Sequence, residues 1–280
     1  MPVRKIAILP TMCTLGNGTC GFAAIVLTSQ ISGGKYFESP VLAAYLSGWL
    51  IFVAMIFDML DGYVARRSKT ASQFGAELDS LCDAISFGVA PAFLLINLGN
   101  DAKVQLSQHL YFGVAILYVW CAVLRLARFN VQTTLDEKSH RFFKGMPSPG
   151  AAGCIASVVL LRYAGQAHGI NAAYLRWIPE ETLAMAITIL APFLGAMVAL
   201  LMVSRFQYVH LTNRIIHRRQ HYRRVVQVML VLFLIFMFRE LVLVLGFWGY
   251  AASGPIKRML REVNPQPVPL PPEPTEQPQA

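Results

Sequence analysis

Charged residues are scarce in this sequence. They make up 14% of its 280 residues, whereas hydrophobic residues make up 55%. A soluble domain carries about 25% charged residues, so this composition argues against a soluble globular protein. The apolar residues also stand in long blocks, several of them close to the ~20 residues with which a helix crosses a bilayer. The sequence therefore predicts an integral membrane protein.

Cysteines are also few, and their spacing forms no recognisable pair. The chain has five of them, an odd number, and no two are in a CxxC arrangement. Each lies in or beside an apolar block, where a cysteine serves as a small buried residue in helix packing. We therefore expect neither a disulfide framework nor a zinc site. The five are Cys13, Cys20, Cys82, Cys121 and Cys154.

The apolar blocks predict the fold class. Membrane helices are expected at about 11–30, 41–66, 80–99, 109–129, 148–166 and 181–203. A last apolar region, about 225–253, is too long for one ordinary span and is interrupted by Arg239 and Glu240. Two short helices that meet near these charges fit it best, and one long tilted helix is the alternative. The expected fold is an all-α integral membrane protein with about eight transmembrane helices.

Basic residues concentrate on one side of the predicted membrane. With eight spans, the opposite side holds only Lys35, Lys103, Arg162 and Arg176. Because Lys and Arg mark the cytoplasmic side, we expect both termini in the cytoplasm and the protein in the cell membrane. This bias explains the net charge of +9 without nucleic acid. The basic run at 213–224 lies beside a membrane helix and suits anionic lipid headgroups.

The chain divides into two parts by composition. Residues 1–255 form the expected polytopic membrane domain, and residues 256–280 form a tail that is first basic and then rich in proline. The segment NPQPVPLPPEPTEQPQA, 264–280, has too few apolar residues to build a core. We expect this cytoplasmic tail to be disordered.

Acidic residues are scarce as well, yet four aspartates gather within 57–88. Asp58 and Asp61 lie near the cytoplasmic end of the second predicted helix, and their i, i+3 spacing sets them roughly 60° apart on one face. Asp79 and Asp83 lie at the start of the third, roughly 40° apart by their i, i+4 spacing. The short polar segment between the helices returns the chain as a hairpin. Both pairs are therefore expected to converge at the cytoplasmic membrane surface.

Four carboxylates this close repel one another unless cations neutralise them. Mg²⁺, Mn²⁺ and Ca²⁺ suit ligation by carboxylates alone, and no histidine or cysteine in this stretch is spaced to favour zinc. Two divalent cations held by carboxylates are a known arrangement for phosphoryl transfer. The sequence predicts such a two-cation site, with Mg²⁺ or Mn²⁺ as its cofactors and Ca²⁺ as a further possible occupant.

Small residues accompany the aspartates. Gly62, Ala65 and Gly75 each stand one helical turn from an aspartate, on the same face. Helix packing in a membrane also favours small residues, but beside four carboxylates they indicate room for a bulky ligand against the backbone. Arg66 is close enough in sequence to bind a phosphate of that ligand.

A transporter is the alternative of a different class. Intramembrane acids of ion- or proton-coupled transporters are expected across several helices, near the bilayer midplane. Here the acids crowd into one hairpin at one surface, and the other predicted spans are nearly free of them. This distribution favours an enzyme.

The pattern Asp58-x₂-Asp61-Gly62-x₂-Ala65-Arg66-x₈-Gly75-x₃-Asp79-x₃-Asp83 resembles the signature of the CDP-alcohol phosphatidyltransferases in every defined position. Further segments resemble the membrane-embedded phosphatidylserine synthases of that family, over about residues 5–255. The resemblance implies a six-helix catalytic core with two C-terminal helices, and a homodimer. The segments are LPTMCTLGNGTCGF (9–22), SLCDAISFGVAPA (80–92), LRLARFNV (124–131), FFKGMPSPGAAGCIAS (142–157) and YAASGP (250–255).

The resemblance also implies a reaction, in which CDP-diacylglycerol and L-serine give phosphatidylserine and CMP. A glycerophosphate, inositol or archaeal-lipid product is the alternative within the family. By this resemblance, Asp58, Asp61 and Asp79 bind the metal ions, and Asp83 completes the site and acts as general base. The implied CDP site comprises Gly62, Ala65, Arg66, Gly75, Thr14 and Asn17.

The sequence leaves several candidates for the residues that contact serine. Its carboxylate needs a cation or backbone donors, and its ammonium needs an acceptor. Arg128 and Lys144 are the preferred candidates, with Asn130, Ser86 and Arg125 as further ones.

Overall fold

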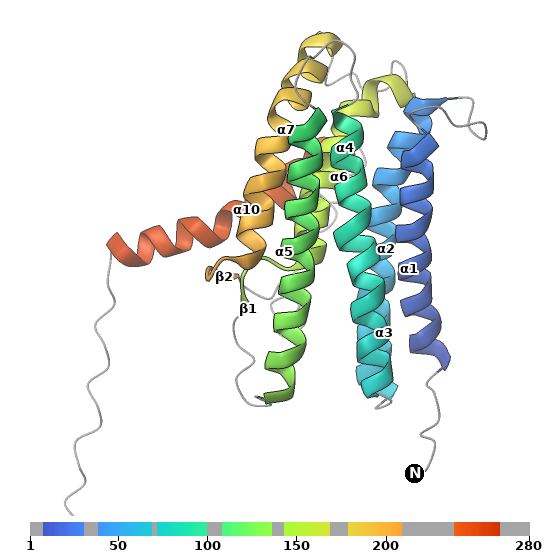
Figure 1. The fold of residues 1–280 in the computed structure, drawn as a ribbon, viewed down its shortest axis with the longest axis vertical. Helices are drawn as coiled ribbons and strands as arrows, with labels where there is room; N and C mark the ends of the chain where they lie inside the picture. Colours follow the sequence, from blue (N-terminus) through green and yellow to red (C-terminus); the bar gives the residue numbers. More distant parts are fainter. Residues whose placement is uncertain are drawn as a thin grey trace, which may run out of the picture.

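Long helices packed side by side make up most of the described part of the protein, and the last of them, α10 (Arg239–Val263), runs at an angle to the others (Figure 1). The computed structural model describes residues 8–30, 39–68, 72–99, 108–135, 143–168, 179–208 and 238–263. The basic run at 213–224, residues 225–237 of the apolar region 225–253 and the tail 264–280 lie outside these residues.

The helices follow the predicted order. They are α1 (Ile8–Ser29), α2 (Pro40–Ser68), α3 (Gln73–Asp83), the π-helix η2 (Ala84–Val89), α4 (Ala90–Leu98), α5 (Gln108–Leu135), α6 (Ser148–His168), α7 (Glu180–Val203) and α10 (Arg239–Val263). Because α3, η2 and α4 follow one another without a break, they form one rod, Gln73–Leu98. Two short strands that the sequence did not predict, β1 (Phe143–Lys144) and β2 (Gln207–Tyr208), pair antiparallel.

Five helices in the described part are long and apolar enough to cross a membrane. They are Ile8–Ser29, Pro40–Ala65, Gln73–Leu98, Gln108–Val131 and Glu180–Val203. The prediction of an all-α integral membrane protein is confirmed, and the protein crosses the membrane several times. Helix α6 packs against α2, α7 and α10 and is buried along most of its length, so its small residues face protein. The total of eight spans stays a prediction.

Two predicted boundaries differ from the structure. The third helix begins at Gln73 instead of about residue 80, because the Ser72 hydroxyl caps it by accepting a hydrogen bond from the Gly75 N–H at 3.1 Å. At the other end, α10 continues to Val263. Residues 256–263, assigned from sequence to the tail, are therefore helical.

Arg239 and Glu240 mark the start of α10. The Glu240 side chain is only 3% exposed and accepts hydrogen bonds from the Tyr45 hydroxyl at 2.8 Å and from Arg239 Nε at 2.7 Å. The Arg239 guanidinium also lies 6.0 Å from the centre of a Trp49 ring. A buried carboxylate needs such partners. The contacts fix the beginning of α10 against α2.

Prolines inside the described helices are matched by buried tyrosines. Each of three prolines removes the N–H that would bond the carbonyl four residues earlier, and a tyrosine hydroxyl donates to that carbonyl instead. Since an unsatisfied carbonyl is costly in apolar surroundings, these bonds stabilise the bundle. For Pro91, the Tyr118 hydroxyl donates to the Phe87 carbonyl at 3.1 Å. For Pro192, the Tyr111 hydroxyl donates to the Thr188 carbonyl. For Pro255, the Tyr208 hydroxyl donates to the Ala251 carbonyl at 3.0 Å.

The turn into α6 brings its first residue close to the end of α7. Gly145 has a φ of 94°, in the left-handed region that favours glycine. Its N–H donates to the Phe206 carbonyl at 2.8 Å, and a Cβ on Gly145 would lie 2.3 Å from the Met202 carbonyl oxygen. Only glycine fits this approach, which leads the chain directly to Ser148 at the start of α6.

Candidate functional site

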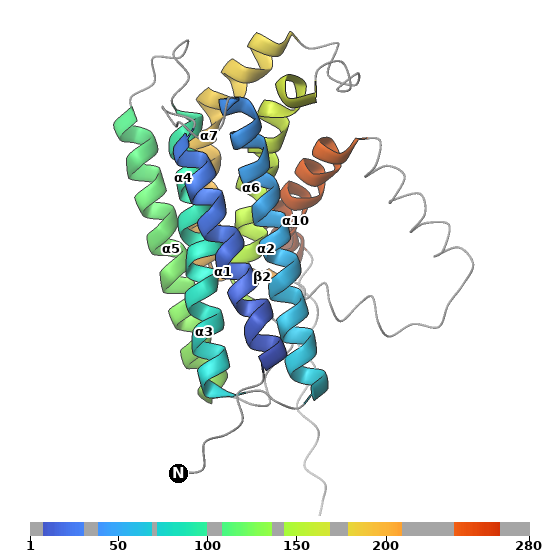
Figure 2. The same cartoon turned by 90° about the vertical axis from the view of Figure 1, so that its right-hand side faces the viewer.

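The aspartates of the sequence motif lie near one end of the bundle, where α2 ends and α3 begins (Figure 2). We call this the carboxylate end. Helix α1 packs against both α2 and α3 there. The predicted helical hairpin is therefore confirmed, although its connection at residues 69–71 lies outside the described part.

Three of the four aspartates come together. Asp58 and Asp61 from α2 and Asp79 from α3 each offer one carboxylate oxygen, and these oxygens all lie within 4.8 Å of one another. Asp61 is only 5% exposed. Asp79 Oδ1 is buried and accepts no hydrogen bond from the residues that the structure describes. Three carboxylates repel at this distance, so the donor set fits a hard divalent cation.

Asp83 stands one helical turn beyond Asp79 on the same rod and is only 9% exposed. It does not belong to the three-oxygen set found among the described residues. The Asn17 side-chain amide donates a hydrogen bond to Asp83 Oδ1 at 2.9 Å instead. Asp83 therefore differs from the other three in its surroundings. That it completes a metal site, as the motif implies, stays a prediction.

Helix α1 supplies the partner of Asp83 through a close helix contact. Asn17 is fully buried, and its backbone carbonyl accepts a hydrogen bond from the Ser86 hydroxyl at 2.9 Å. A Cβ on Gly21 would lie 2.6 Å from Ser86 Cα, so only glycine permits this approach. Thr14, one turn before Asn17, is buried and donates to the Pro10 carbonyl of its own helix. CDP contacts at Thr14 and Asn17 stay predictions.

The π-helix follows directly on Asp83. In η2 the hydrogen bonds widen, and the Ala90 N–H bonds the Ile85 carbonyl five residues earlier. Such widened turns inside α-helices are frequent at functional sites. Here the widened turn holds Ser86 against α1 and Phe87 against Tyr118 of α5. It thereby connects Asp83 to both neighbouring helices.

Among the described side chains, Arg125 of α5 brings a positive charge to the site. Its Nη1 donates a hydrogen bond to the Ser148 hydroxyl at 2.6 Å, and Ser148 is fully buried. Its guanidinium lies within electrostatic range of the Asp83 and Asp58 carboxylates. The first residue of α6 therefore holds the positive charge of Arg125 in place.

The other predicted serine contacts are placed differently. Asn130 exchanges hydrogen bonds with Ser80, its side-chain nitrogen lying 2.9 Å from the hydroxyl. Ser86 is fully buried in the contact with α1. Arg128 is half-buried on α5. Lys144 belongs to β1, and its side chain lies outside the described part.

The predicted CDP residues flank the cluster. Gly62 and Ala65 are half-buried on α2, immediately beyond the aspartates. Gly75 lies in the first turn of α3, where its N–H is bonded to Ser72. The side chain of Arg66 lies outside the described part. The placement is compatible with a shared ligand, and contact with one stays a prediction.

The sequence did not single out two features of this site. The bond from Asn17 to Asp83 joins residues 66 positions apart, and no local pattern encodes such a pairing. Ser148 was part of the segment FFKGMPSPGAAGCIAS, whose prolines and glycine signal a helix start. A serine at that start was the available signal for a polar partner.

Comparison with known proteins agrees with the motif. The sequence pattern of the family described as CDP-alcohol phosphatidyltransferase matches residues 7–202. A CDP-diacylglycerol–serine O-phosphatidyltransferase of Methanocaldococcus jannaschii is 39% identical over 150 residues, which are 54% of this chain and 59% of that protein. A protein of the same name from Helicobacter pylori is 32% identical over 163 residues, 58% of this chain and 61% of that protein.

An archaetidylserine synthase of Methanothermobacter thermautotrophicus is 34% identical over 160 residues, 56% of this chain and 60% of that protein. The matches thus span about three fifths of these relatives. The family pattern, in contrast, extends over well more than half of the sequence and includes every residue of the carboxylate cluster. The chain belongs to the CDP-alcohol phosphatidyltransferase family.

Proposed function

We propose that this protein is a phosphatidylserine synthase, which transfers the phosphatidyl group of CDP-diacylglycerol to the hydroxyl of L-serine and releases CMP. The observation that carries the proposal is the carboxylate cluster of Asp58, Asp61 and Asp79 beside a separately held carboxylate, Asp83. Family membership supports a CDP-linked donor. The names of the relatives from Methanocaldococcus jannaschii and Helicobacter pylori support serine as the acceptor.

In the proposed reaction, the serine hydroxyl oxygen forms a bond to the phosphorus that carries diacylglycerol. The bond from that phosphorus to the CMP oxygen breaks, and CMP leaves with the electron pair. The hydroxyl proton passes to Asp83, the proposed general base. Asn17 occupies Asp83 Oδ1 as a donor, which orients the carboxylate and leaves its other oxygen for the proton.

Asp58, Asp61 and Asp79 are the proposed metal ligands, with Asp83 as a further one. These carboxylates would hold two divalent cations, Mg²⁺ or Mn²⁺, whose positive charge would screen the pyrophosphate and stabilise the attacking and leaving oxygens. The buried Asp79 Oδ1, which accepts no hydrogen bond in the described part of the chain, supports a cation at this position. Gly62, Ala65, Arg66, Gly75, Thr14 and Asn17 remain the proposed CDP-site residues.

For the serine carboxylate we favour Arg125 over the other candidates. Its charge acts on Asp83, the proposed base, so a carboxylate bound to it would bring the serine hydroxyl near that base. Ser148 holds the guanidinium through one nitrogen, and an arginine has further donors for a carboxylate. Arg128, Lys144, Asn130 and Ser86 remain alternatives or additional contacts.

The proposed location is the cytoplasmic membrane, with the active site and both termini on the cytoplasmic side. The uneven distribution of Lys and Arg along the sequence supports this orientation. The homodimer is a further proposal and rests on the family resemblance alone.

The test is an assay of purified full-length protein with CDP-diacylglycerol, Mn²⁺ or Mg²⁺ and labelled L-serine. We expect labelled phosphatidylserine and one CMP for each, and loss of both on chelation, with recovery when Mn²⁺ returns. Glycerol 3-phosphate and inositol serve as competing acceptors. If CMP release depends on one of these acceptors and serine gives none, the assignment of serine is overturned. The assignment to the family is not affected by that result.

An archaeal-type lipid donor is the second candidate, because one relative is named an archaetidylserine synthase. The acceptor and the bond chemistry would be the same, and only the lipid tails of the donor would differ. The same assay with CDP-archaeol in place of CDP-diacylglycerol separates the two. An ion- or proton-coupled transporter, the alternative of another class, predicts flux across vesicles without CMP release.

A further inference from the structure

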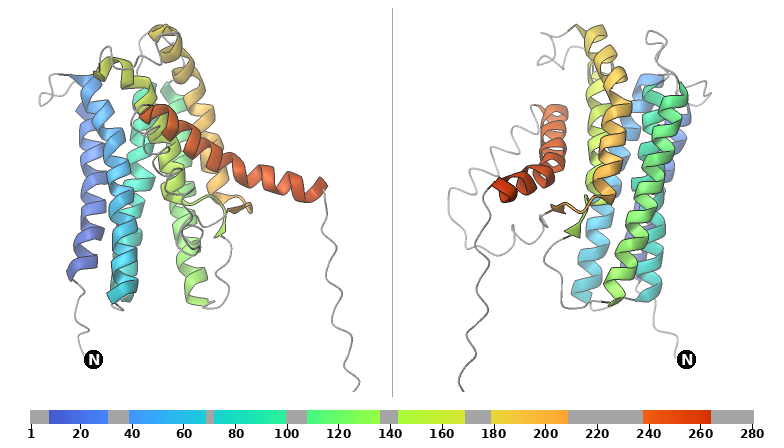
Figure 3. Two further views of the ribbon diagram at one scale, coloured as in Figure 1. Left: turned by 180° about the vertical axis from the view of Figure 1, so that it is seen from behind. Right: turned by 60° about the vertical axis from the view of Figure 1, so that its left-hand side comes forward.

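The last two turns of α10 extend away from the bundle. Figure 3 shows α10 running at an angle to the other helices, with its C-terminal end lying apart from them. Its middle is firmly packed, since a Cβ on Gly153 of α6 would lie 2.2 Å from a Phe247 ring carbon. Gly254 is the last such contact, because a Cβ there would lie 2.5 Å from the Tyr208 ring. Beyond Gly254, the exposure of the side chains of α10 increases.

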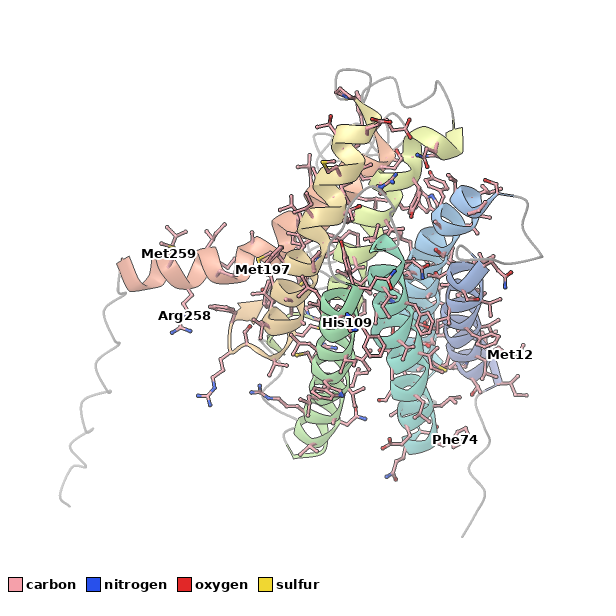
Figure 4. All side chains as sticks on the ribbon, turned by 45° about the horizontal axis from the view of Figure 1, so that its top comes forward. Met12, Phe74, His109, Met197, Arg258 and Met259 are labelled. Atoms are coloured by element: carbon pink, nitrogen blue, oxygen red, sulfur yellow. The ribbon has the colours of Figure 1, made fainter. Side chains whose placement is uncertain are left out.

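The segment after Pro255 is amphipathic. Ile256, Met259 and Leu260 follow i, i+3, i+4 spacing, which places them on one face. Their side chains are 53%, 71% and 63% exposed. Lys257 and Arg258 lie on the other side of the helix and are exposed as well. Figure 4 shows Met259 and Arg258 pointing to opposite sides of α10.

The depth of this segment follows from its contacts. Helix α7 has 24 residues, so it rises about 36 Å, enough for a hydrocarbon core of about 30 Å. Its end at Val203 therefore lies at the membrane boundary. Phe206 and Tyr208 follow immediately, and they contact the outgoing part of α10: the Arg258 guanidinium lies 5.6 Å from the centre of the Phe206 ring. The amphipathic turns consequently emerge at that boundary.

We propose that residues 256–260 of α10 form an interfacial anchor for anionic lipid. Ile256, Met259 and Leu260 insert among the acyl chains just below the headgroups, and Lys257 and Arg258 bind headgroup phosphates. An amphipathic helix with a basic polar side has this chemistry, and each basic residue adds attraction to an anionic surface. The inference is independent of the proposed enzymatic activity, because it uses no residue of the carboxylate cluster.

A second copy of the chain is the competing occupant of this face. A standard protein interface needs about 800 Å² on each partner, far more than three side chains on two helical turns provide. The two adjacent cations also complement phosphate groups, whereas two symmetry-related copies would bring like charges close together. Charge and area both favour lipid.

The test places a fluorescent probe on each side of the helix in the full-length protein. Met259→Cys and Lys257→Cys are each labelled with an environment-sensitive dye, in a background with Cys13→Ala and Cys20→Ala. The other three thiols, Cys82, Cys121 and Cys154, are buried and should not react. Each labelled protein is reconstituted in phosphatidylcholine vesicles with and without phosphatidylglycerol, and a nitroxide attached to the upper acyl chain serves as quencher.

We expect quenching at position 259 to be at least about twofold stronger than at 257, and to rise when phosphatidylglycerol is present. Lys257→Gln with Arg258→Gln should abolish that rise while the probe stays at 259. Leu260→Cys repeats the measurement if Met259→Cys does not fold. Equal quenching at 257 and 259 overturns the proposal. So does a disulfide that joins two copies through Met259→Cys, because the face would then be an interface between copies.

Discussion

The side-chain amide of Asn17 donates a hydrogen bond to Asp83 across 66 residues of sequence. The carboxylate is buried between α1 and the π-helix, and the asparagine is buried with it. A carboxylate in such a place has few ways to rotate. This bond therefore gives the Asp83 carboxylate one fixed orientation.

We predict that Asn17→Ala lowers the turnover of the folded protein and also lowers the stability of the bundle, because it leaves a buried carboxylate oxygen without its donor. A hydrogen bond to a charged group contributes about 1.5–3 kcal/mol, so kcat should fall by about 10- to 100-fold. Release of CMP from CDP-diacylglycerol in the presence of serine measures the effect. Thr19→Ala is the matched control, since its hydroxyl bonds the Leu15 carbonyl on the exposed side of the same helix.

Thr19→Ala should keep full activity. An Asn17→Ala protein with unchanged kcat would show that Asp83 needs no orientation by α1. If instead the KM for CDP-diacylglycerol rises while kcat is unchanged, Asn17 acts as a nucleotide contact, as the family resemblance implies.

The meeting of Asp58 and Asp61 with Asp79 was predictable from sequence, whereas the hydrogen-bond partners of Asp83 and Arg125 were not. Spacings of i, i+3 and i, i+4 fix the faces of single helices, and the short polar connection between Asp61 and Asp79 fixes how two helices meet. The bond from Asn17 to Asp83 depends on the close packing of α1 against η2. Gly21 permits this packing, but no periodic pattern in the sequence predicts it. The same holds for Arg125, whose bond to Ser148 joins two helices.

Two helix boundaries were predicted wrongly from the sequence. The third helix begins at Gln73, in a polar stretch without membrane-like hydropathy. Ser72, its N-cap, was the residue in the sequence that could have indicated this start. At the other end, residues 256–263 were assigned from sequence to the tail, yet α10 continues to Val263. The carbonyl that Pro255 leaves without a partner is bonded by Tyr208, so the proline does not break the helix.

Asp79→Asn should abolish activity and weaken divalent-cation binding. One of its oxygens is buried without a hydrogen bond from the described residues, and loss of its charge removes one of three clustered ligands. Binding of Mn²⁺ by the purified protein, followed by electron paramagnetic resonance, gives a readout that does not depend on turnover. We expect at least a 10-fold weaker affinity, since ligand losses are typically of that order or larger.

Glu77→Gln is the control for Asp79→Asn. It removes an exposed acid from the same helix, two residues away, and should leave Mn²⁺ binding and activity unchanged. Full activity in both Asp79→Asn and Asp83→Asn would refute the proposed mechanism, whatever the metal binding.

The tyrosine that bonds the carbonyl before Pro255 should stabilise the bundle measurably. Burial raises the pKa of Tyr208 to about 12, so the hydroxyl keeps its proton and donates throughout the physiological range. Tyr208→Phe leaves the Ala251 carbonyl buried without a donor, at a cost of about 1–3 kcal/mol. Thermal unfolding in detergent should shift down by several degrees, about 2–4 °C per kcal/mol for a chain of this size.

Tyr63→Phe is the matched control, because the Tyr63 side chain is 53% exposed. Its melting temperature should equal that of the unchanged protein. Equal stability of the Tyr208→Phe variant would mean that water or a shifted helix turn satisfies the Ala251 carbonyl.

Close approach of α1 to η2 makes Gly21 sensitive to a single methyl group. A Cβ there would lie 2.3 Å from the Ser86 hydroxyl oxygen and 2.6 Å from Ser86 Cα, so Gly21→Ala must push the helices apart. Overpacking of this kind costs about 1–3 kcal/mol, and it also lengthens the bond from Asn17 to Asp83. We expect lower stability and lower kcat together. Gly113→Ala, with no atom within 4 Å of the added Cβ, should change neither.

Arg125 and Arg128 are competing candidates for the residue that binds the serine carboxylate, and substitution of each should affect the choice of acceptor differently. If Arg125 binds the serine carboxylate, Arg125→Gln should lower kcat/KM for serine by about 10- to 100-fold, as expected for loss of a charge-assisted bond. Ethanolamine, which lacks the carboxylate, should be used no less well than before, so the preference for serine over ethanolamine shrinks. The KM for CDP-diacylglycerol should stay the same. Arg128→Gln should leave the preference intact, because Arg128 lies one turn further along α5 than Arg125, which Ser148 holds. The reverse outcome assigns the carboxylate to Arg128, and a loss of activity with both acceptors in Arg125→Gln would mean that its charge serves Asp83 and Asp58 instead of serine.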